Sequence, residues 1–210
     1  MIRIIIVDDH PVVRRGLKQI LHEEPDVKVV GEAESAQEAF KIIRTIDCDA
    51  VVLDISLPGA SGVEILKQLK YEYQKLPVLI LSVHPEEQYA VRVIKAGASG
   101  YLTKESAPDE LVKAIRKIIS GGKYISSSLA ERLITDIDAS GKPRHEKLSD
   151  REFGIMRMIA QGKAIKKIAE ELHLSEKTVS TYRTRLLEKM KMTTNAEIIS
   201  YALKNKLIEQ

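Results

Sequence analysis

Short apolar runs alternate with segments of helical periodicity from residue 2 to about residue 120. Four runs have the length and composition of buried strands: Ile4–Val7, Ala50–Leu53, Val78–Leu81 and Gly100–Thr103. Apolar residues at helical spacing predict the helices that follow: Pro11–Glu24, Ser35–Ile46, Ser61–Tyr73, Glu86–Ala96 and Pro108–Ser120. With one further strand, these four runs make five strands that alternate with the five helices. The alternation predicts a doubly wound α/β domain, in which helices cover both faces of a five-stranded parallel sheet.

Capping signals and breakers mark the ends of these elements. Ser35 and Glu38 have the spacing of a capping box, and Gly121-Gly122 ends the fifth helix. Ser126–Ser128 can begin a short helix to about Thr135, before a polar stretch that Gly and Pro interrupt up to His145. We therefore expect a first domain over residues 1–121, a linker with a short helix over 122–146, and a second domain over 147–210.

The second domain has the pattern of four helices. Capping boxes open the first and the last of them, at Ser149 with Glu152 and at Thr194 with Glu197. The predicted spans are Ser149–Ala160, Ala164–Leu172, Ser175–Met190 and Thr194–Lys204. Only His173-Leu174-Ser175 joins the second helix to the third, with Ser175 opening the latter. This is the short turn of a helix-turn-helix in an all-α domain.

The charge is unevenly divided between the two predicted domains. Residues 1–141 hold 18 Lys/Arg and 21 Asp/Glu, whereas residues 142–210 hold 15 and 9. A basic second domain favours a polyanionic partner, and scattered surface lysine is the alternative. Cys48 is the single cysteine, which excludes a disulfide framework. The sequence shows neither a signal peptide nor a membrane span, so we expect a cytoplasmic protein that has no contact with membranes.

A residue whose side chain can bind a metal ion or a phosphoryl group follows each apolar run. Because parallel strands present their carboxyl ends at one edge, where ligands bind, these side chains are expected to converge: Asp8, Asp9, Asp54, Ser82 and Lys104. Three carboxylates together attract a hard cation such as Mg²⁺, and one of them can then attack phosphorus to form an acyl phosphate. The alternative is an ordinary loop edge with solvated acids.

Asp54 is the best candidate nucleophile, because it stands alone at a strand end before the turn Leu57–Gly59. Three aspartates and the backbone carbonyl of one serine would be the ligands of the cation: Asp8, Asp9, Asp54 and Ser56. Lys104 would pair with the phosphoryl oxygens, and Ser82 would hydrogen-bond to one of them.

These motifs give residues 2–120 a resemblance to the receiver domain of two-component response regulators: Val7–His10, Asp54–Gly62 and Gly100–Lys104. The resemblance implies a flavodoxin-like receiver in which Asp54 accepts phosphate from a sensor histidine kinase and Mg²⁺ is required. It also implies that Ser82 moves towards the phosphoryl group and that Tyr101 swings inward. Glu105 departs from the pattern, since many receivers have a proline there. Ser56 and His84 flank the pocket and are candidates for tuning the lifetime of the phosphate; the alternative is that they are ordinary surface residues.

The predicted helix from Ser175 to Met190 separates into two faces. At 100° per residue, Val179, Leu186 and Met190 gather on one side with Leu187 at its edge. The opposite face holds Lys177, Ser180, Thr181, Thr184 and Glu188, with Arg185 beside them. Small hydroxyl residues flanked by Lys and Arg suit a helix in the major groove of DNA. A solvated polar face is the alternative.

Residues 148–208 resemble the LuxR-type helix-turn-helix through Leu148–Glu152 and Ile168–Val179. A receiver followed by this module is typical of the NarL/FixJ family, and Thr178–Arg185 is similar to its GacA/UvrY-like branch. The resemblance implies base contacts near Ser180, Thr181 and Thr184, with phosphate contacts from Lys177, Thr178, Tyr182, Arg183 and Arg185. It departs at Ala164, where the family usually has a capping serine, and at Tyr182, where many members have histidine.

One recognition helix discriminates too little, so we expect the phosphorylated chain to bind paired half-sites of double-stranded DNA as a homodimer. The apolar stripe of the last helix is the candidate dimer surface: Ile198, Ile199, Ala202 and Leu203. The alternative is that this stripe closes the core of its own domain. The resemblance also implies that the resting receiver masks the DNA-binding helix.

The sequence therefore predicts a phosphorylation-switched transcription regulator, with catalysis limited to self-phosphotransfer and autodephosphorylation at Asp54. A receiver that docks partners without phosphorylation is the main alternative. An aspartyl phosphatase would want a second aspartate at Ser56, and a flavin-binding protein would want a Gly/Ser/Thr-rich phosphate loop where Asp8–Pro11 stands.

Overall fold

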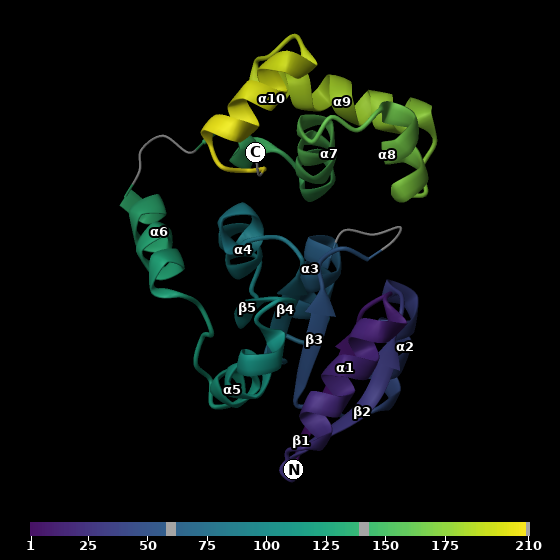
Figure 1. The fold of residues 1–210 in the computed structure, drawn as a ribbon, viewed down its shortest axis with the longest axis vertical. Helices are drawn as coiled ribbons and strands as arrows, with labels where there is room; N and C mark the ends of the chain where they lie inside the picture. Colours follow the sequence, from purple (N-terminus) through teal and green to yellow (C-terminus); the bar gives the residue numbers. More distant parts are fainter. Residues whose placement is uncertain (58–61, 139–142, 209–210) are drawn as a thin grey trace. The chain divides into compact units, whose positions relative to one another are not determined.

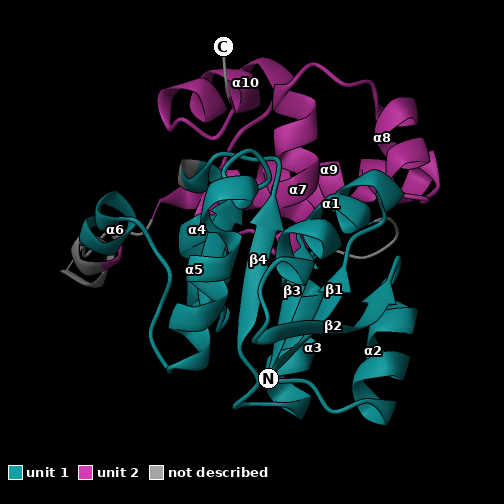
Figure 2. Ribbon diagram, turned by 60° about the horizontal axis from the view of Figure 1, so that its bottom comes forward, with its two compact units in different colours: residues 1–131 teal, residues 132–210 magenta. Residues whose placement is uncertain are grey.

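The computed structural model describes residues 1–57, 62–138 and 143–208. The chain forms two compact units, residues 1–131 and 132–210, which Figure 2 colours separately. Within the described ranges, none of the helices has the length and apolar character needed to cross a bilayer.

A parallel sheet of five strands, counted over the described residues, forms the centre of the first unit (Figure 1). Its strands are β1 (Ile2–Val7), β2 (Val27–Ala33), β3 (Ala50–Asp54), β4 (Val78–Ser82) and β5 (Gly100–Thr103). They run in the order β2-β1-β3-β4-β5, which confirms the predicted doubly wound class. The four apolar runs lie in the four adjacent strands β1, β3, β4 and β5.

Helices connect successive strands, as the periodicity predicts. They are α1 (Pro11–His22), α2 (Ala36–Thr45), α3 (Gly62–Glu72), α4 (Glu86–Lys95) and α5 (Ala107–Ile119). On one face of the sheet, Ile4 and Val52 pack with α1 and α5 through Leu17, Leu21 and Leu111 in one apolar cluster. The alternate residues of the same strands are also buried, because the remaining helices cover the other face (Figure 1).

The capping box predicted for α2 forms only in part. Ser35 Oγ accepts a hydrogen bond from the Glu38 backbone N–H at 3.3 Å, so the N-cap is present. The Glu38 carboxylate accepts from the backbone N–H of Glu34 at 2.9 Å rather than from that of Ser35. The second hydrogen bond of the predicted capping box is therefore wrong: the Glu38 carboxylate bonds to the backbone N–H of Glu34, one residue before the predicted donor.

After α5 the chain returns to the edge of the sheet. The Tyr124 N–H donates to the Ser99 carbonyl at 2.9 Å, and the Tyr101 N–H donates to the Tyr124 carbonyl at 3.1 Å. Gly100 permits this approach, because a Cβ there would lie 2.8 Å from Tyr124 Cβ. Burial, followed by a hydrogen bond to Glu110, raises the pKa of Tyr124 to about 12. This edge segment, residues 123–126, thus pairs with β5.

The edge segment leads into α6 (Ser127–Asp138), which is longer than the predicted helix. Ser126 Oγ accepts from the Leu129 N–H at 3.0 Å, as an N-cap does, and also hydrogen-bonds to the Glu86 carboxylate at the start of α4. The predicted linker from Asp138 to His145 lies partly outside the described residues, which omit 139–142.

The second unit contains a short 3₁₀-helix that the sequence did not predict, η1 (Arg144–Lys147), and the expected helices α7 (Asp150–Ala160), α8 (Ile165–Glu171), α9 (Glu176–Met190) and α10 (Asn195–Lys204). Both capping boxes predicted for this unit are present, at Ser149 with Glu152 and at Thr194 with Glu197. Helix α7 packs against α9 and α10 around buried Phe153. Arg144 donates to the Met190 carbonyl at 3.1 Å, which fixes η1 to the end of α9.

Candidate functional site

The carboxyl edge of the sheet gathers the predicted polar residues. Asp8 follows β1, Asp54 and Ser82 end β3 and β4, and Lys104 follows β5. The strand register places Asp54 beside Leu81 and Ser82 beside Thr103. Asp8, Asp54 and Ser82 are almost fully buried, at 1%, 1% and 0% exposure. The solvated loop edge that the sequence left open is therefore wrong for these residues.

Lys104 joins the two buried carboxylates. Its Nζ lies 2.7 Å from Asp8 Oδ2 and 2.8 Å from Asp54 Oδ2, the second with hydrogen-bond geometry. Burial alone would lower the pKa of Lys104, but its close contacts with the carboxylates of Asp54 and Asp8 leave the pKa raised. The ammonium is therefore held charged between two carboxylates.

The turn after Asp54 holds the other oxygen of its carboxylate. Asp54 Oδ1 accepts from the backbone N–H of Ser56 at 2.9 Å. The pKa of Asp54 is raised, because burial outweighs the lowering by Lys104 and by Ser56. Gly62 closes the turn by donating its N–H to the Ile55 carbonyl at 3.1 Å, and a Cβ at Gly62 would lie only 2.4 Å from Ile55 Cα. The predicted turn residues Pro58 and Gly59 fall outside the described residues.

The donor set of this acidic pocket fits a small hard cation. Asp8, Asp9, His10 and Asp54 can each offer one ligand atom, all within 4.8 Å of one another. The buried atoms Asp8 Oδ2 and Asp9 Oδ1 make no hydrogen bond within the described part of the chain; their near neighbours are the ion-pair contacts from Lys104 and His10. Carboxylate oxygens suit Mg²⁺. His10 was not predicted as a donor, although it follows the acidic pair directly.

Ser82 and Tyr101 lie on one chain of hydrogen bonds beside the pocket. Ser82 Oγ accepts from the His84 N–H at 3.0 Å, and the Tyr101 hydroxyl donates to the His84 carbonyl at 2.7 Å. Tyr101 is 4% exposed, so its ring already lies inside this structure. The His84 ring stacks on Tyr89 with centroids 5.3 Å apart. The peptide bond before Glu105, where many receivers have proline, is trans.

Arg14, on α1, is a residue of the pocket that sequence reasoning missed. Its Nη1 donates to the backbone carbonyl of Asp8 at 2.6 Å. No spacing signal marks a side chain whose acceptor is a backbone carbonyl, so this contact had to come from the structure.

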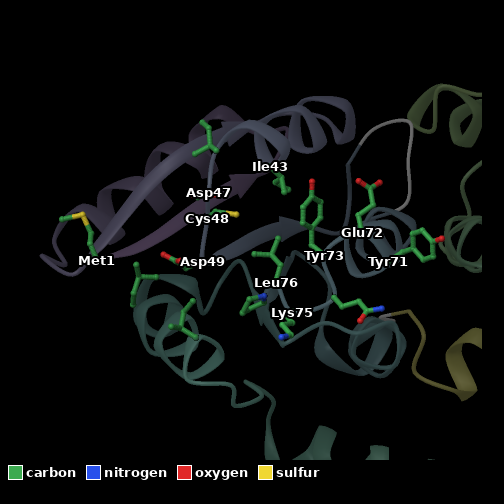
Figure 3. A pocket seen from close by; sticks show the side chains of 15 residues that line it. Met1, Ile43, Asp47, Cys48, Asp49, Tyr71, Glu72, Tyr73, Lys75 and Leu76 are labelled. Carbon is green, nitrogen blue, oxygen red and sulfur yellow. The ribbon is translucent and has the colours of Figure 1, made fainter.

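A second hollow lies at the opposite edge of the sheet, near the chain start (Figure 3). Its acidic residues have arginine partners: Asp49 pairs with Arg3 at 3.0 Å and Glu72 pairs with Arg44 at 3.1 Å. Cys48 also lines it, and burial raises the pKa of this thiol to about 11. With the carboxylates paired and the thiol protonated, this hollow offers neither an open metal site nor a nucleophile near neutral pH.

In the second unit, α9 has the two faces that the sequence predicts. Val179, Leu186 and Met190 are fully buried and Leu187 nearly so. The opposite face is exposed at Lys177, Ser180, Thr181, Thr184 and Arg185, while Thr178 and Tyr182 are half-buried. Thr181 and Thr184 donate their hydroxyls to carbonyls one turn earlier, at 2.9 and 3.2 Å.

Other residues predicted to touch DNA or a second copy have contacts inside the unit. Arg183 is half-buried, and its Nε donates to Asn195 Oδ1 at 2.8 Å. On α10, Ile198 and Ala202 are fully buried in the unit itself, which is the alternative that the sequence left open for this stripe. Ile199 is partly exposed and Leu203 is 38% exposed. At the start of α8, Ala164 makes no side-chain cap.

Comparison with known proteins accounts for both units. Residues 4–116 match the response regulator receiver domain, and residues 146–202 match the luxR family of bacterial regulatory proteins. The chain is 38% identical over 209 residues to the response regulator UvrY of Escherichia coli, covering 99% of this chain and 96% of that protein. It is 34% identical over 214 residues to the response regulator GacA of Pseudomonas aeruginosa, covering 100% and 99%.

Solved structures of the response regulator RcsB from Salmonella typhimurium have the same fold. One matches with a TM-score of 0.70 at 25% identity, covering 97% of this chain and 98% of that one. A second, of RcsB bound to a promoter in the presence of the phosphomimetic BeF3⁻, matches with a TM-score of 0.66 at 27% identity, covering 95% and 97%.

Proposed function

This chain belongs to the NarL/FixJ family of two-component response regulators, which bind DNA through a LuxR-type helix-turn-helix, and from that premise we propose that phosphorylation of Asp54 by a sensor histidine kinase switches its DNA binding. The observation that carries the proposal is the buried pair of carboxylates, Asp8 and Asp54, held by Lys104 at 2.7 and 2.8 Å. A carboxylate kept out of water and beside a cation is suited to attack phosphorus.

In the transfer, an oxygen of the Asp54 carboxylate attacks the phosphorus of a phosphohistidine on the kinase. A new O–P bond forms, the P–N bond breaks, and the imidazole leaves with the electron pair of that bond and takes up a proton. Asp8, Asp9, Asp54 and the Ser56 carbonyl would hold Mg²⁺, which supplies positive charge against the phosphoryl oxygens. Lys104 exchanges its contact with Asp54 for a phosphoryl oxygen.

The same residues take part in the dephosphorylation of Asp54, which returns the receiver to its resting state. Water attacks the phosphorus and loses a proton, the O–P bond to Asp54 breaks, and inorganic phosphate leaves. The Asp54 carboxylate then returns to its contact with Lys104. The chemistry of the chain is thus confined to its own phosphoryl group. Ser56, beside the acceptor, and His84, whose backbone bonds to Ser82 and Tyr101, are positioned to affect how long the acyl phosphate survives.

Phosphorylation is coupled to the rest of the receiver through Ser82. We expect its hydroxyl to leave the His84 N–H and bond to the phosphoryl group, which shifts the loop that the Tyr101 hydroxyl also holds. Moving a two-state equilibrium from 1:99 to 99:1 needs about 5.5 kcal/mol of preference between the states. Charge-assisted contacts of a phosphoryl group with Lys104 and with the cation are of this order.

The DNA-binding half of the proposal rests on the exposed polar face of α9. Ser180, Thr181 and Thr184 would meet base edges, while Lys177, Thr178, Tyr182 and Arg185 hold phosphates. Arg183 contributes less than the sequence implies, because Asn195 already accepts its hydrogen bond. RcsB, whose structures include dimers bound to DNA, supports binding as a homodimer on paired half-sites. In this chain Ile199 and Leu203 are the accessible part of the α10 stripe.

The test compares wild type, Asp54→Asn and the control Asp47→Asn, whose side chain is 92% exposed. Each is treated with acetyl phosphate and Mg²⁺, then measured by intact mass, by light scattering and by selection of bound fragments from random DNA. We expect one phosphoryl adduct, a shift to dimer and tighter DNA binding for wild type and Asp47→Asn, and none of these for Asp54→Asn. Binding of DNA that is equally tight with and without the adduct would favour a phosphorylation-independent receiver instead.

A further inference from the structure

Arg14 is fixed between the acidic pocket and the end of β2. It lies one helical turn after His10, and its side chain is 15% exposed. Nη1 donates to the Asp8 carbonyl at 2.6 Å. On the other side, Nε lies 3.7 Å from Glu32 and Nη2 lies 3.8 Å from Glu34. The guanidinium therefore connects the loop after β1 to Glu32 of the neighbouring strand β2 and to Glu34, just after that strand.

This contact supplies the hydrogen bond of the Asp8 backbone carbonyl. Oδ1 of Asp8 accepts from the His10 N–H at 2.8 Å, and Oδ2 lies 2.7 Å from Lys104. The Asp8 N–H donates to the Ala33 carbonyl at 3.0 Å. The carbonyl is the one remaining polar group of a residue that is 1% exposed, and an unpaired buried carbonyl costs about 1–3 kcal/mol.

The carbonyl of Asp8 also sets the direction of Asp9. The two residues share one planar peptide unit, so a hydrogen bond that fixes the Asp8 carbonyl fixes the backbone from which the Asp9 side chain projects. We propose that Arg14 is a positioning residue for the divalent cation: it holds the Asp8–Asp9 peptide so that both carboxylates face one ligand position. The inference rests on the Mg²⁺ requirement of the proposed function and names the residue that sets the affinity.

The geometry asks for arginine rather than lysine at position 14. One guanidinium nitrogen reaches the Asp8 carbonyl while the others face Glu32 and Glu34, and a fixed planar fork can hold these directions together. A lysine would supply the charge and at most part of the contacts. The positive charge of Arg14 by itself repels the cation, so removing that charge alone should strengthen Mg²⁺ binding. A loss of affinity in Arg14→Met would therefore come from the lost hydrogen bond to the Asp8 carbonyl and not from the lost charge.

The experiment measures Mg²⁺ affinity of the full chain by isothermal titration calorimetry, and the extent of Asp54 phosphorylation by acetyl phosphate against Mg²⁺ concentration. The variants are Arg14→Met, Arg14→Lys and Arg15→Met, the last being a matched charge deletion at the next, exposed position of α1. We expect Arg14→Met to raise the Kd for Mg²⁺ about tenfold, or about 1.4 kcal/mol. Arg14→Lys should lie between, and Arg15→Met should stay within twofold. Saturating Mg²⁺ should restore full phosphorylation.

A role confined to the fold would lower the phosphorylated fraction at every Mg²⁺ concentration, and that result would overturn the proposal. So would an unchanged Kd in Arg14→Met, or an equal loss in Arg15→Met. If Arg14→Met does not fold, Arg14→Lys decides, because it keeps the positive charge and removes the planar fork, and it should raise the Kd by a smaller factor. Failure of wild type to bind Mg²⁺ or to become phosphorylated would instead refute the proposed function itself.

Discussion

Replacing Lys104 with methionine removes the charge that holds two buried carboxylates together. Removing one partner of a buried ion pair costs roughly 3–5 kcal/mol. The Lys104 side chain is 13% exposed while its partners are 0–1% exposed, so we expect the lower end, a loss of about 3 kcal/mol in the free energy of unfolding of the first unit. The control Lys113→Met, at an exposed position on α5, should change it by less than about 0.5 kcal/mol.

The loss in Lys104→Met should depend on pH and on Mg²⁺. Burial already raises the pKa of Asp54, and Lys104 is the strongest influence that lowers it. Without Lys104 the folded-state pKa rises further above the unfolded value of about 3.9. A carboxylate whose folded-state pKa is raised destabilises the fold once the pH exceeds its unfolded value, so the loss should be larger at pH 7.5 than at pH 4.5. Added Mg²⁺ should stabilise Lys104→Met more than wild type, because the cation replaces the missing charge.

The assay is urea unfolding in EDTA, followed by hydrogen exchange of peptides from β1 and β3 so that the first unit is observed by itself. The double variant Asp54→Asn with Lys104→Met should recover most of the loss, because it removes one of the two unpaired charges. A loss below about 1 kcal/mol, or one that is the same at pH 4.5 and 7.5, would refute the view that Lys104 is the main counter-charge of the pocket.

Three further predictions concern other parts of the chain. Ala164→Ser should supply the missing N-cap of α8 and stabilise the second unit by about 0.5–1 kcal/mol in urea unfolding; no gain would mean that the α8 start is already satisfied. Lys177→Ala should weaken binding to all DNA sequences and reduce the salt slope by about one ion, whereas Arg183→Ala should have the smaller effect because Asn195 holds that side chain; the reverse order in anisotropy titrations would contradict this. Cys48, with its pKa of about 11, should react with iodoacetamide at pH 8 about a hundredfold more slowly than a free thiol, and the rate should rise tenfold per pH unit; a rate independent of pH would contradict the raised pKa.

The sequence predicted the pocket well because a strand end is a local signal with a fixed spatial meaning. Asp8, Asp54, Ser82 and Lys104 each follow an apolar run, and parallel strands bring such ends together whatever the intervening helices contain. The strand β2 was the weak point. Its residues include Lys28, Gly31 and Glu32, and most of it is only partly buried at the edge of the sheet, so it has no continuous apolar run.

Contacts that depend on direction could not be predicted from spacing. The apolar stripe of α10 looks the same whether it faces its own unit or a second copy, and only the structure shows that Ile198 and Ala202 are in the core. The sequence likewise indicated a DNA contact for Arg183 and no role for Arg14, and it showed the acceptor of neither. Their acceptors, Asn195 Oδ1 and the Asp8 carbonyl, lie on other elements.

The pairing of the edge segment with β5 decides where this protein can be cut or fused. A receiver fragment that stops at residue 121 would leave the Tyr101 N–H without the Tyr124 carbonyl and would expose the backbone of an edge strand, a template for aggregation. A fragment that runs through residue 131 retains this pairing and the Ser126 cap of α6. In chimaeric regulators built on this receiver, the fusion point should therefore lie beyond the start of α6. The edge segment and its pairing with β5 then stay intact.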